Sequence, residues 1–418
     1  MYRQIGVLIP ILFFALLVVN PNIEGGSIGG RDTYLDGRNI YDASSGIMVE
    51  MLDAGWRVGI SSEEIISMNL TDRGLIGKNL YNVTDIIYSM NSSSVYLYDI
   101  KNYPGTRFIY YATLIGVSDY NVSGVQYRNI TLGILRINYT ANISGWDAKP
   151  SSIEWVFTNT TTFRWDELYS GYYVAPRINF LKTVFLENKT YIIIYDIVRY
   201  AYNSTLDVIV KNTTLIAYRF GNMDTPIAEP IWKHGTFLGF VTGITLTSYN
   251  NTPVMAYGEV RYVFRESVMA LEYGIIIREG GDVYSIDMGD RYNPLEIGRA
   301  VVIPKNNTSD IVIGGIMKDI LEQKNMVVWV IARGTPGSRN IVLRVVTDDL
   351  AIERKFGIRF EVSYPLVAYF GIENICWSIF TMSADIEQHM AILTVNYSNL
   401  DEFYLEIMEE EYLTLIHI

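Results

Sequence analysis

The sequence predicts a mainly β fold with two β-sandwich-like domains, a small mixed N-terminal subregion and a short C-terminal α/β segment. The chain has 418 residues, 49% of them hydrophobic and 19% charged, which is enough apolar material for more than one folded core. It contains 32 tyrosines and many Ile, Val and Thr residues, which favour pleated, half-buried strands. From about Val95 onward, short apolar or alternating runs recur between turn residues at the spacing typical of all-β sandwiches.

Residues 1–20 predict export, as a signal peptide or an N-terminal anchor. Arg3 is the only charged side chain before the apolar block Ile5–Val19, a pattern typical of a secretory signal. Fifteen helical residues rise only about 22 Å against a hydrocarbon core of roughly 30 Å, which favours a signal over a membrane span. No pair of small residues follows the block and Pro21 occupies the expected cleavage region, so an uncleaved anchor stays open.

Residues 21–94 are expected to form a leader and a small mixed subregion. The glycine-rich stretch Gly25–Gly30 predicts a flexible leader. The apolar residues of Ile47–Leu52 fall on one face of a helix, and Ser61–Glu64 matches a helix capping box. These are the first helical signals of the chain.

Residues 95–220 are expected to form a glycosylated β-sandwich domain. Its clearest strand-like runs alternate with period two or are continuously β-branched. They are Arg107–Ile115, Tyr127–Tyr139, Ser152–Phe157, Tyr191–Tyr202 and Leu206–Phe220.

Residues 221–365 are expected to form a second β domain. Two strand-like runs flank Glu279–Asp282, whose central glycines suit the primed turn of a hairpin. Apolar residues of Ile316–Leu321 predict a short helix, and Met326–Ala332 predicts a buried strand because it is apolar throughout. The alternation in Ile358–Ser363 predicts a further strand.

Residues 366–418 are expected to form an α/β segment. The apolar run Leu366–Phe380 is too short to span a membrane. Ser398–Asp401 predicts the cap of an amphipathic helix that reaches Glu410. The last residues, Leu413–Ile418, predict an edge strand, which can pair with another subunit.

The chain carries fifteen N-x-[ST] acceptor triplets, far more than chance gives for this length. They begin at Asn69, Asn82, Asn91, Asn121, Asn129, Asn138, Asn142, Asn159, Asn188, Asn203, Asn212, Asn250, Asn306, Asn307 and Asn396. Asn is also common in turns, so each triplet alone is a weak signal. Because they coincide with an export signal and fall mostly at predicted strand ends, we expect many to be glycosylated. Twelve precede residue 251, so the N-terminal half is expected to face outward and the C-terminal half to pack on a neighbour.

Composition excludes several classes of function. A net charge of −12 gives the protein no positive electrostatic potential that would attract the phosphate backbone, which argues against nucleic acid as a partner. The single cysteine, Cys376, rules out an intramolecular disulfide and is expected to be a buried small hydrophobe. The three histidines, His234, His389 and His417, lack the spacing of a local zinc motif, and no metal site is assigned.

Two local clusters are candidates for chemistry. Asp282, Asp287 and Asp290 are either turn residues, a calcium site with hard oxygen ligands, or a catalytic carboxylate pair. The stretch Trp165–Tyr173 contains Trp165, Asp166, Glu167, Tyr169, Tyr172 and Tyr173. It is either a sugar-stacking platform or a set of core or interface aromatics.

These features together favour an exported, N-glycosylated cell-surface protein of a structural or binding kind, such as an envelope-layer or appendage subunit. One alternative is a secreted hydrolase that acts on glycan or peptide through a carboxylate pair. A second is a monomeric surface module that binds a ligand. Expected partners are further copies of the chain or other surface proteins, with the membrane contacted only through an uncleaved N-terminal segment. Disulfide-free export with many acceptor triplets resembles archaeal surface proteins in style.

Overall fold

The computed structural model describes residues 38–42, 47–52, 55–60, 81–82, 84–106, 108–139, 150–233, 236–265, 268–304, 308–356, 361–370, 375–384, 387–396 and 399–407. The expected signal or anchor, the glycine-rich leader, the capping box at Ser61–Glu64 and the terminal strand Leu413–Ile418 lie outside these residues. Most of the described chain is β-strand, which confirms the mainly β fold.

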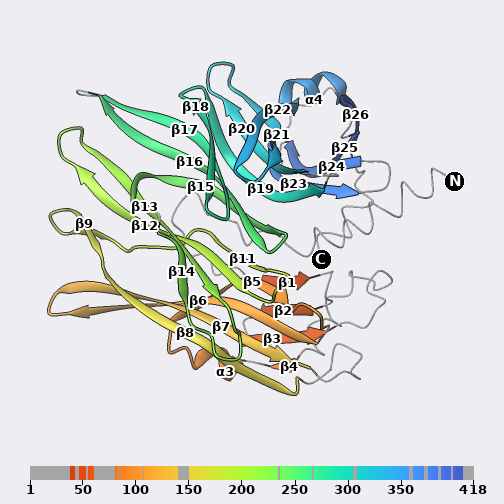
Figure 1. Ribbon diagram of the computed structural model, residues 1–418. Helices are drawn as coiled ribbons and strands as arrows, with labels where there is room; N and C mark the ends of the chain where they lie inside the picture. Colours follow the sequence, from red (N-terminus) through yellow and green to blue (C-terminus); the bar gives the residue numbers. More distant parts are fainter. Residues whose placement is uncertain are drawn as a thin grey trace.

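Within the described residues, the strands form a series of antiparallel meanders, in which each strand pairs with the next along the chain (Figure 1). The first comprises β1 (Arg38–Asp42), β2 (Ile47–Leu52), β3 (Gly55–Ile60) and β4 (Tyr81–Asn82), and the second β5 (Ser94–Asn102), β6 (Ile109–Val122), β7 (Val125–Asn138) and β8 (Ser152–Arg164). The third comprises β11 (Leu181–Phe185), β12 (Tyr191–Asn203), β13 (Val208–Phe220) and β14 (Glu229–Lys233), and the fourth β15 (Phe237–Tyr249), β16 (Thr252–Arg265), β17 (Val268–Glu279) and β18 (Asp282–Gly289). The fifth comprises β19 (Tyr292–Pro304), β20 (Ser309–Asp319), β21 (Lys324–Thr335) and β22 (Ser338–Asp348), and the sixth β23 (Glu361–Phe370), β24 (Ile375–Ala384), β25 (Glu387–Asn396) and β26 (Asn399–Ile407).

Three smaller elements complete this part of the chain. The hairpin of β9 (Asp166–Tyr169) and β10 (Tyr172–Val174) links the second and third meanders. The helices are α3 (Thr84–Tyr88) and α4 (Asp349–Phe356).

The central meanders stack face to face, so their strands are buried on both sides. β12 shows this most clearly, since every residue from Tyr191 to Val198 is buried. Ile193 belongs to the core shared with β6 and β7, whereas the next residue, Ile194, belongs to the core shared with β15 and β16. A further core joins β16 and β17 to β20 and β21. Double-sided burial explains why this stretch of β12 is almost entirely apolar rather than alternating.

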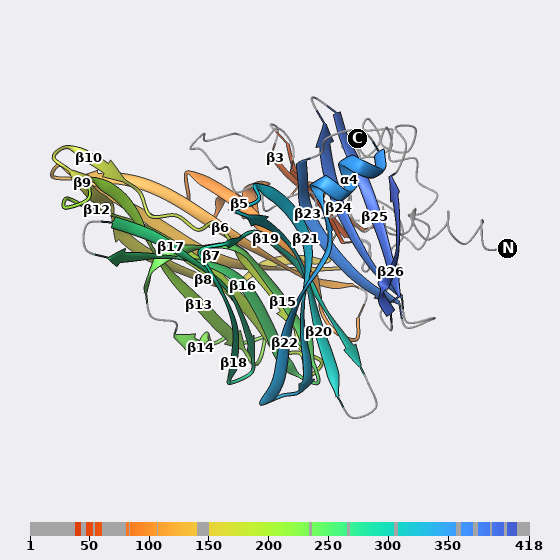
Figure 2. The same cartoon turned by 90° about the horizontal axis from the view of Figure 1, so that it is seen from above.

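The first strands of successive meanders lie next to one another: β5 contacts β11, β11 contacts β15, β15 contacts β19, and β19 contacts β23. These first strands therefore connect each meander to the next. The hairpins β6–β7, β9–β10 and β12–β13 all point to the end of the molecule that lies away from β23–β26, as both views show (Figures 1 and 2).

The predicted border between residues 220 and 221 falls between two paired strands. β13 pairs with β14, and its residues Asn212 and Thr213 also pair with β15, which joins the third and fourth meanders into one eight-stranded sheet. The domain borders given above stay a prediction.

Three predicted helices are wrong. Ile47–Leu52 is strand β2, and the described part of the predicted C-terminal helix is strand β26. In Ile316–Leu321, Ile316 and Met317 lie in strand β20, and Ile320 and Leu321 lie in the turn that follows it. In β20 nearly every side chain is buried, and most positions are apolar. Some apolar residues are therefore three or four positions apart, which is also the spacing on one face of a helix. The pairing partners of these segments decided in favour of strands.

Two local predictions are confirmed. Glu279 pairs with Asp282 across a tight turn, and Gly280 adopts a φ of +56°, which glycine tolerates best. Met326–Ala332 lies in β21 and is buried throughout.

Candidate functional site

The structure separates Asp282 from the other two predicted aspartates. Asp282 is exposed in the β17–β18 turn, and Asp287 lies five residues further along β18, about 16 Å away at the usual rise of a strand. The Oδ1 atom of Asp287 accepts a hydrogen bond of 2.9 Å from the backbone N–H of Gly289, so this carboxylate stabilises the next turn. Asp290 is exposed in that turn. Asp282 therefore does not form a carboxylate pair with the other two, and all three occupy turn positions. In the part of the chain that the structure describes, no three His, Cys, Asp or Glu side chains gather as a metal site.

The acceptor asparagines lie at accessible positions. Asn91, Asn121, Asn159, Asn188 and Asn250 are exposed, and Asn129, Asn138, Asn203 and Asn212 are half-buried. Asn82 lies in β4 and Asn396 in β25. Asn69, Asn142, Asn306 and Asn307 lie outside the described residues.

Three of these asparagines use one amide atom to close a hairpin turn. Oδ1 of Asn121 accepts the N–H of Gly124 at 2.8 Å, and Oδ1 of Asn188 accepts the N–H of Thr190 at 3.1 Å. Oδ1 of Asn203 accepts the N–H groups of Thr205 and Leu206 at 3.0 and 3.2 Å. A sugar attaches to the other amide atom, Nδ2. The turn and the glycan therefore do not compete for the same atom.

A shallow groove of about 510 Å³ opens on the surface. Its apolar floor includes Leu186 and Ile231, and Arg219 and Glu229 form an exposed ion pair at its side. Asn188 and Thr252, which belong to two different acceptor triplets, also line it. Sugars on these triplets would border this groove.

The predicted aromatic cluster splits into an exposed pair and a buried remainder. The rings of Tyr169 and Tyr172 stack with centroids 5.0 Å apart and planes at 8°, and the two residues are 51% and 47% exposed. The ring of Tyr202 meets Tyr169 edge-on. Trp165 and Tyr173 are half-buried, and the Arg128 guanidinium lies 5.8 Å from the Trp165 ring. Only the tyrosine pair offers an open aromatic surface.

Asp166 holds this hairpin against β12. Its carboxylate accepts a hydrogen bond of 2.5 Å from Arg199 and one of 2.9 Å from the backbone N–H of Tyr200. The neighbouring Glu167 is exposed. Asp166 therefore positions the aromatic pair and is not itself offered to a ligand.

Sequence reasoning missed Asp196, a fully buried carboxyl group in the middle of β12. Its Oδ1 atom accepts the backbone N–H groups of Asn179 and Phe180, both at 2.8 Å, where the chain bulges before β11. Its Oδ2 atom is buried without a hydrogen-bond partner. Burial raises the pKa of Asp196 from 3.8 to about 7, against the lowering effect of the two backbone donors. No sequence signal marked it, because the flanking residues Tyr195 and Ile197 match an ordinary buried strand.

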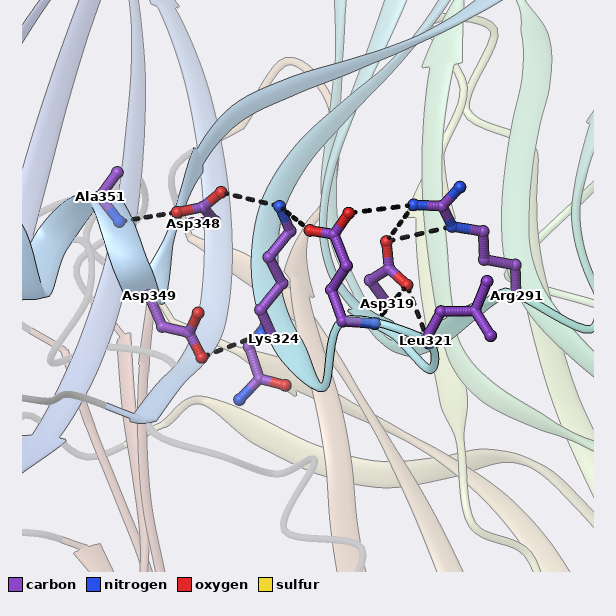
Figure 3. A network of polar contacts seen from close by, with 9 residues as sticks. Arg291, Asp319, Leu321, Lys324, Asp348, Asp349 and Ala351 are labelled. Atoms are coloured by element: carbon purple, nitrogen blue, oxygen red, sulfur yellow. Dashed lines mark hydrogen bonds and ion pairs between the residues drawn. The ribbon is translucent and has the colours of Figure 1, made fainter.

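Two groups of charged residues form networks in which the charges are paired. Figure 3 shows a chain of contacts in which Arg291 binds Asp319 at 2.7 Å and Lys324 binds Asp348 at 3.3 Å, linked through Glu322. The Arg291 guanidinium lowers the pKa of Asp319. The network ties the β20–β21 turn to β19 and to the end of β22, which is a structural role.

A second network is fully buried between β17 and the β21–β22 turn. Arg339 binds both carboxylate oxygens of Glu279, at 2.6 and 2.7 Å, and donates to the carbonyl and hydroxyl oxygens of Ser309. Both side chains of the ion pair are at most 1% exposed. Each charge is satisfied, so this pair also has a structural role.

Comparisons with known proteins identify no family. No family model matches the chain, and no curated protein matches it. A variant of Synechocystis apocarotenoid oxygenase is similar at a TM-score of 0.38 and 8% identity, over 89% of this chain and 74% of that chain. Penicillium chrysogenum α-L-arabinanase, complexed with arabinobiose, is similar at a TM-score of 0.32 and 9% identity, over 75% of this chain and 94% of that chain. An endo-arabinase from Bacteroides thetaiotaomicron is similar at a TM-score of 0.24 and 10% identity, over 74% of this chain and 93% of that chain. Similarity at this level identifies neither a shared fold nor a shared activity.

Among the described residues, neither helix has the length and apolar character needed to cross a bilayer.

Proposed function

We propose that this chain is an exported, N-glycosylated cell-surface protein with a structural or binding role. The observation that carries the proposal is the position of the acceptor asparagines on exposed or half-buried surface, several of them at hairpin turns. At Asn121, Asn188 and Asn203 the turn uses only Oδ1, so a sugar on Nδ2 would leave the fold intact. The apolar N-terminal block supplies the export signal.

Asp282 does not complete a carboxylate pair of the kind that the hydrolase alternative needs. Asp282 and Asp287 are separated by about 16 Å, beyond the roughly 5–10 Å that glycoside hydrolysis requires.

The first experiment tests glycosylation at a single turn. Asn203→Asp keeps the turn acceptor Oδ1 but removes Nδ2, so we expect this variant to lose one glycan while its melting temperature stays close to that of the unglycosylated parent. Thr205→Ser is the matched control, because it keeps the acceptor triplet. Glycopeptide mass spectrometry on protein exported from a glycosylating host provides the measurement. Absence of sugar from all the described triplets would overturn the proposal.

The second experiment separates the structural role from the binding role. The glycosylated chain from Asn22 onward is examined by light scattering and by electron microscopy of the same sample. Sheets, filaments or large rings support a structural subunit. A monomer at all concentrations contradicts self-assembly and leaves the binding role.

A further inference from the structure

Two cations and three aromatic rings gather between the third and fourth meanders, on the same face of β12 as Asp196. Arg177 lies in the segment before β11 and Lys211 lies in β13, whereas Phe240 and Tyr262 come from β15 and β16. Tyr200 of β12 stands between the two cations. All five side chains are half-buried and therefore reachable from solvent.

The contacts are continuous from one cation to the other. Arg177 pairs with Val198 through the backbone, and its guanidinium carbon lies 5.6 Å from the centroid of the Tyr200 ring. Tyr200 is directly opposite Lys211 in the β12–β13 ladder, where side chains of paired residues touch. The Lys211 ammonium lies 4.5 Å from the centroid of the Phe240 ring.

The floor of this cluster belongs to the neighbouring meander. Phe240 and Tyr262 have ring centroids 6.2 Å apart. A hydrogen bond from the backbone N–H of Lys211 lowers the pKa of Tyr262, although burial raises it overall. The two meanders therefore meet at Lys211, and the cluster contains residues of both.

Neither cation of this cluster has a carboxylate partner among the described residues. Elsewhere arginines are commonly paired with carboxylates, as in Arg128–Asp119, Arg136–Glu154, Arg199–Asp166 and Arg219–Glu229. Burial lowers the pKa of Lys211, the charge of Arg177 lowers it further, and the nearby Asp196 raises it. Asp196 forms no ion pair with either cation, because its Oδ1 atom accepts backbone N–H groups and its Oδ2 atom is buried without a partner. In a chain of net charge −12, two adjacent cations without an ion-pair partner among the described residues are the unusual feature.

We propose that Arg177, Lys211 and the rings of Tyr200, Phe240 and Tyr262 bind a small ring-shaped ligand through an oxyanion that it carries. A guanidinium presents a planar fork of donors that matches carboxylate, sulfate and phosphate groups. An ammonium adds a compact charge, and the aromatic side chains beside the two cations supply apolar surface for the body of the ligand. A sugar acid or a sugar phosphate has this chemistry. The site stands independently of the glycosylation proposed above, because none of its residues is an acceptor asparagine.

The test is calorimetry on the exported, folded protein with four probes: glucuronate, glucose 6-phosphate, inorganic sulfate and neutral glucose. We expect glucuronate or glucose 6-phosphate to bind more tightly than sulfate, and glucose not to bind. The preferred sugar tells whether the oxyanion is a carboxylate or a phosphate. Absence of binding by both charged sugars at millimolar concentration overturns the proposal, and sulfate binding as tightly as the sugars overturns the role of the rings.

Variants locate the binding to this cluster. Arg177→Gln and Lys211→Gln are each expected to weaken binding about tenfold or more, because each removes a charge-assisted hydrogen bond. Arg265→Gln is the control, since Arg265 lies on the same strand as Tyr262, is exposed and pairs with Glu272. Equal loss in the control, or no loss in the two variants, overturns the assignment.

A second readout follows the ammonium directly. Nuclear magnetic resonance titration of Lys211 is expected to show its pKa rising when the charged sugar is bound, because the oxyanion stabilises the protonated form. An unchanged Lys211 pKa at saturating ligand contradicts direct contact. In Arg177→Gln, where Lys211 is retained, the same titration distinguishes loss of one contact from loss of folding.

Discussion

The buried carboxyl group of Asp196 makes stability depend on pH in an unusual direction. Most aspartates have a pKa lowered by folding and stabilise the protein as pH rises, but burial raises the pKa of Asp196 from 3.8 to about 7. Between these two values the folded protein retains a proton that the unfolded chain has lost. Asp196 therefore contributes stability that is fully present below about pH 4 and is lost as pH rises through about 7.

The magnitude follows from the size of the shift. About three pKa units at roughly 1.4 kcal/mol each give about 4 kcal/mol over the whole window. Between pH 5 and pH 8 the same relation gives about 2.5 kcal/mol. The full value applies without discount for screening, because Asp196 has no exposed surface.

Asp196→Asn isolates this contribution, since an amide has nearly the same shape and does not titrate. Its Oδ1 atom can still accept the N–H groups of Asn179 and Phe180, and its Nδ2 atom adds a cost that does not depend on pH. We expect the unfolding free energy of the wild type, minus that of the variant, to fall by about 2.5 kcal/mol from pH 5 to pH 8. Urea denaturation followed by fluorescence at both pH values measures this difference. A difference that is constant or rises with pH would refute the reasoning.

Two further predictions concern packing. Arg339→Met leaves the carboxylate of Glu279 buried without its partner and is expected to cost about 3–5 kcal/mol of unfolding free energy. Adding Glu279→Leu removes the unpaired charge and is expected to recover most of the loss. An equal loss in the double variant contradicts this account. Gly239→Ala would place a Cβ atom 2.0 Å from the carbonyl oxygen of Val260, so we expect a loss of about 1–3 kcal/mol or more, measured by chemical denaturation. Gly221→Ala is its control, because a Cβ atom there meets nothing within 4 Å, and equal effects of the two substitutions would exclude the clash as the cause.

β12 packs against other meanders on both of its faces, and this kind of burial explains why the sequence pattern suggested a helix where the structure has a strand. A strand that is buried on both faces needs apolar side chains at successive positions, so period-two alternation disappears. In β20 this produced the appearance of a helix, and only the pairing of Ile313 with Ala300 and Val330 shows that the segment is a strand. Local spacing carries no information about these partners, because they are distant in sequence.

The sequence by itself determined the features that depend on neighbouring residues. The β class follows from β-branched and aromatic composition, and the Glu279–Asp282 turn follows from its glycines. The positions of many acceptor asparagines in turns follow in the same way, because the Asn amide oxygen bonds to backbone groups two or three residues away.

Only the tertiary structure decided which chemical groups meet. The two cations of the proposed oxyanion site lie 34 positions apart, and their aromatic floor comes from still later strands. Asp282 and Asp287, close in sequence, are separated because an extended strand advances more than 3 Å with each residue. In a fold made of stacked antiparallel sheets, contacts between faces join residues from different meanders, so proximity along the chain does not predict proximity in space.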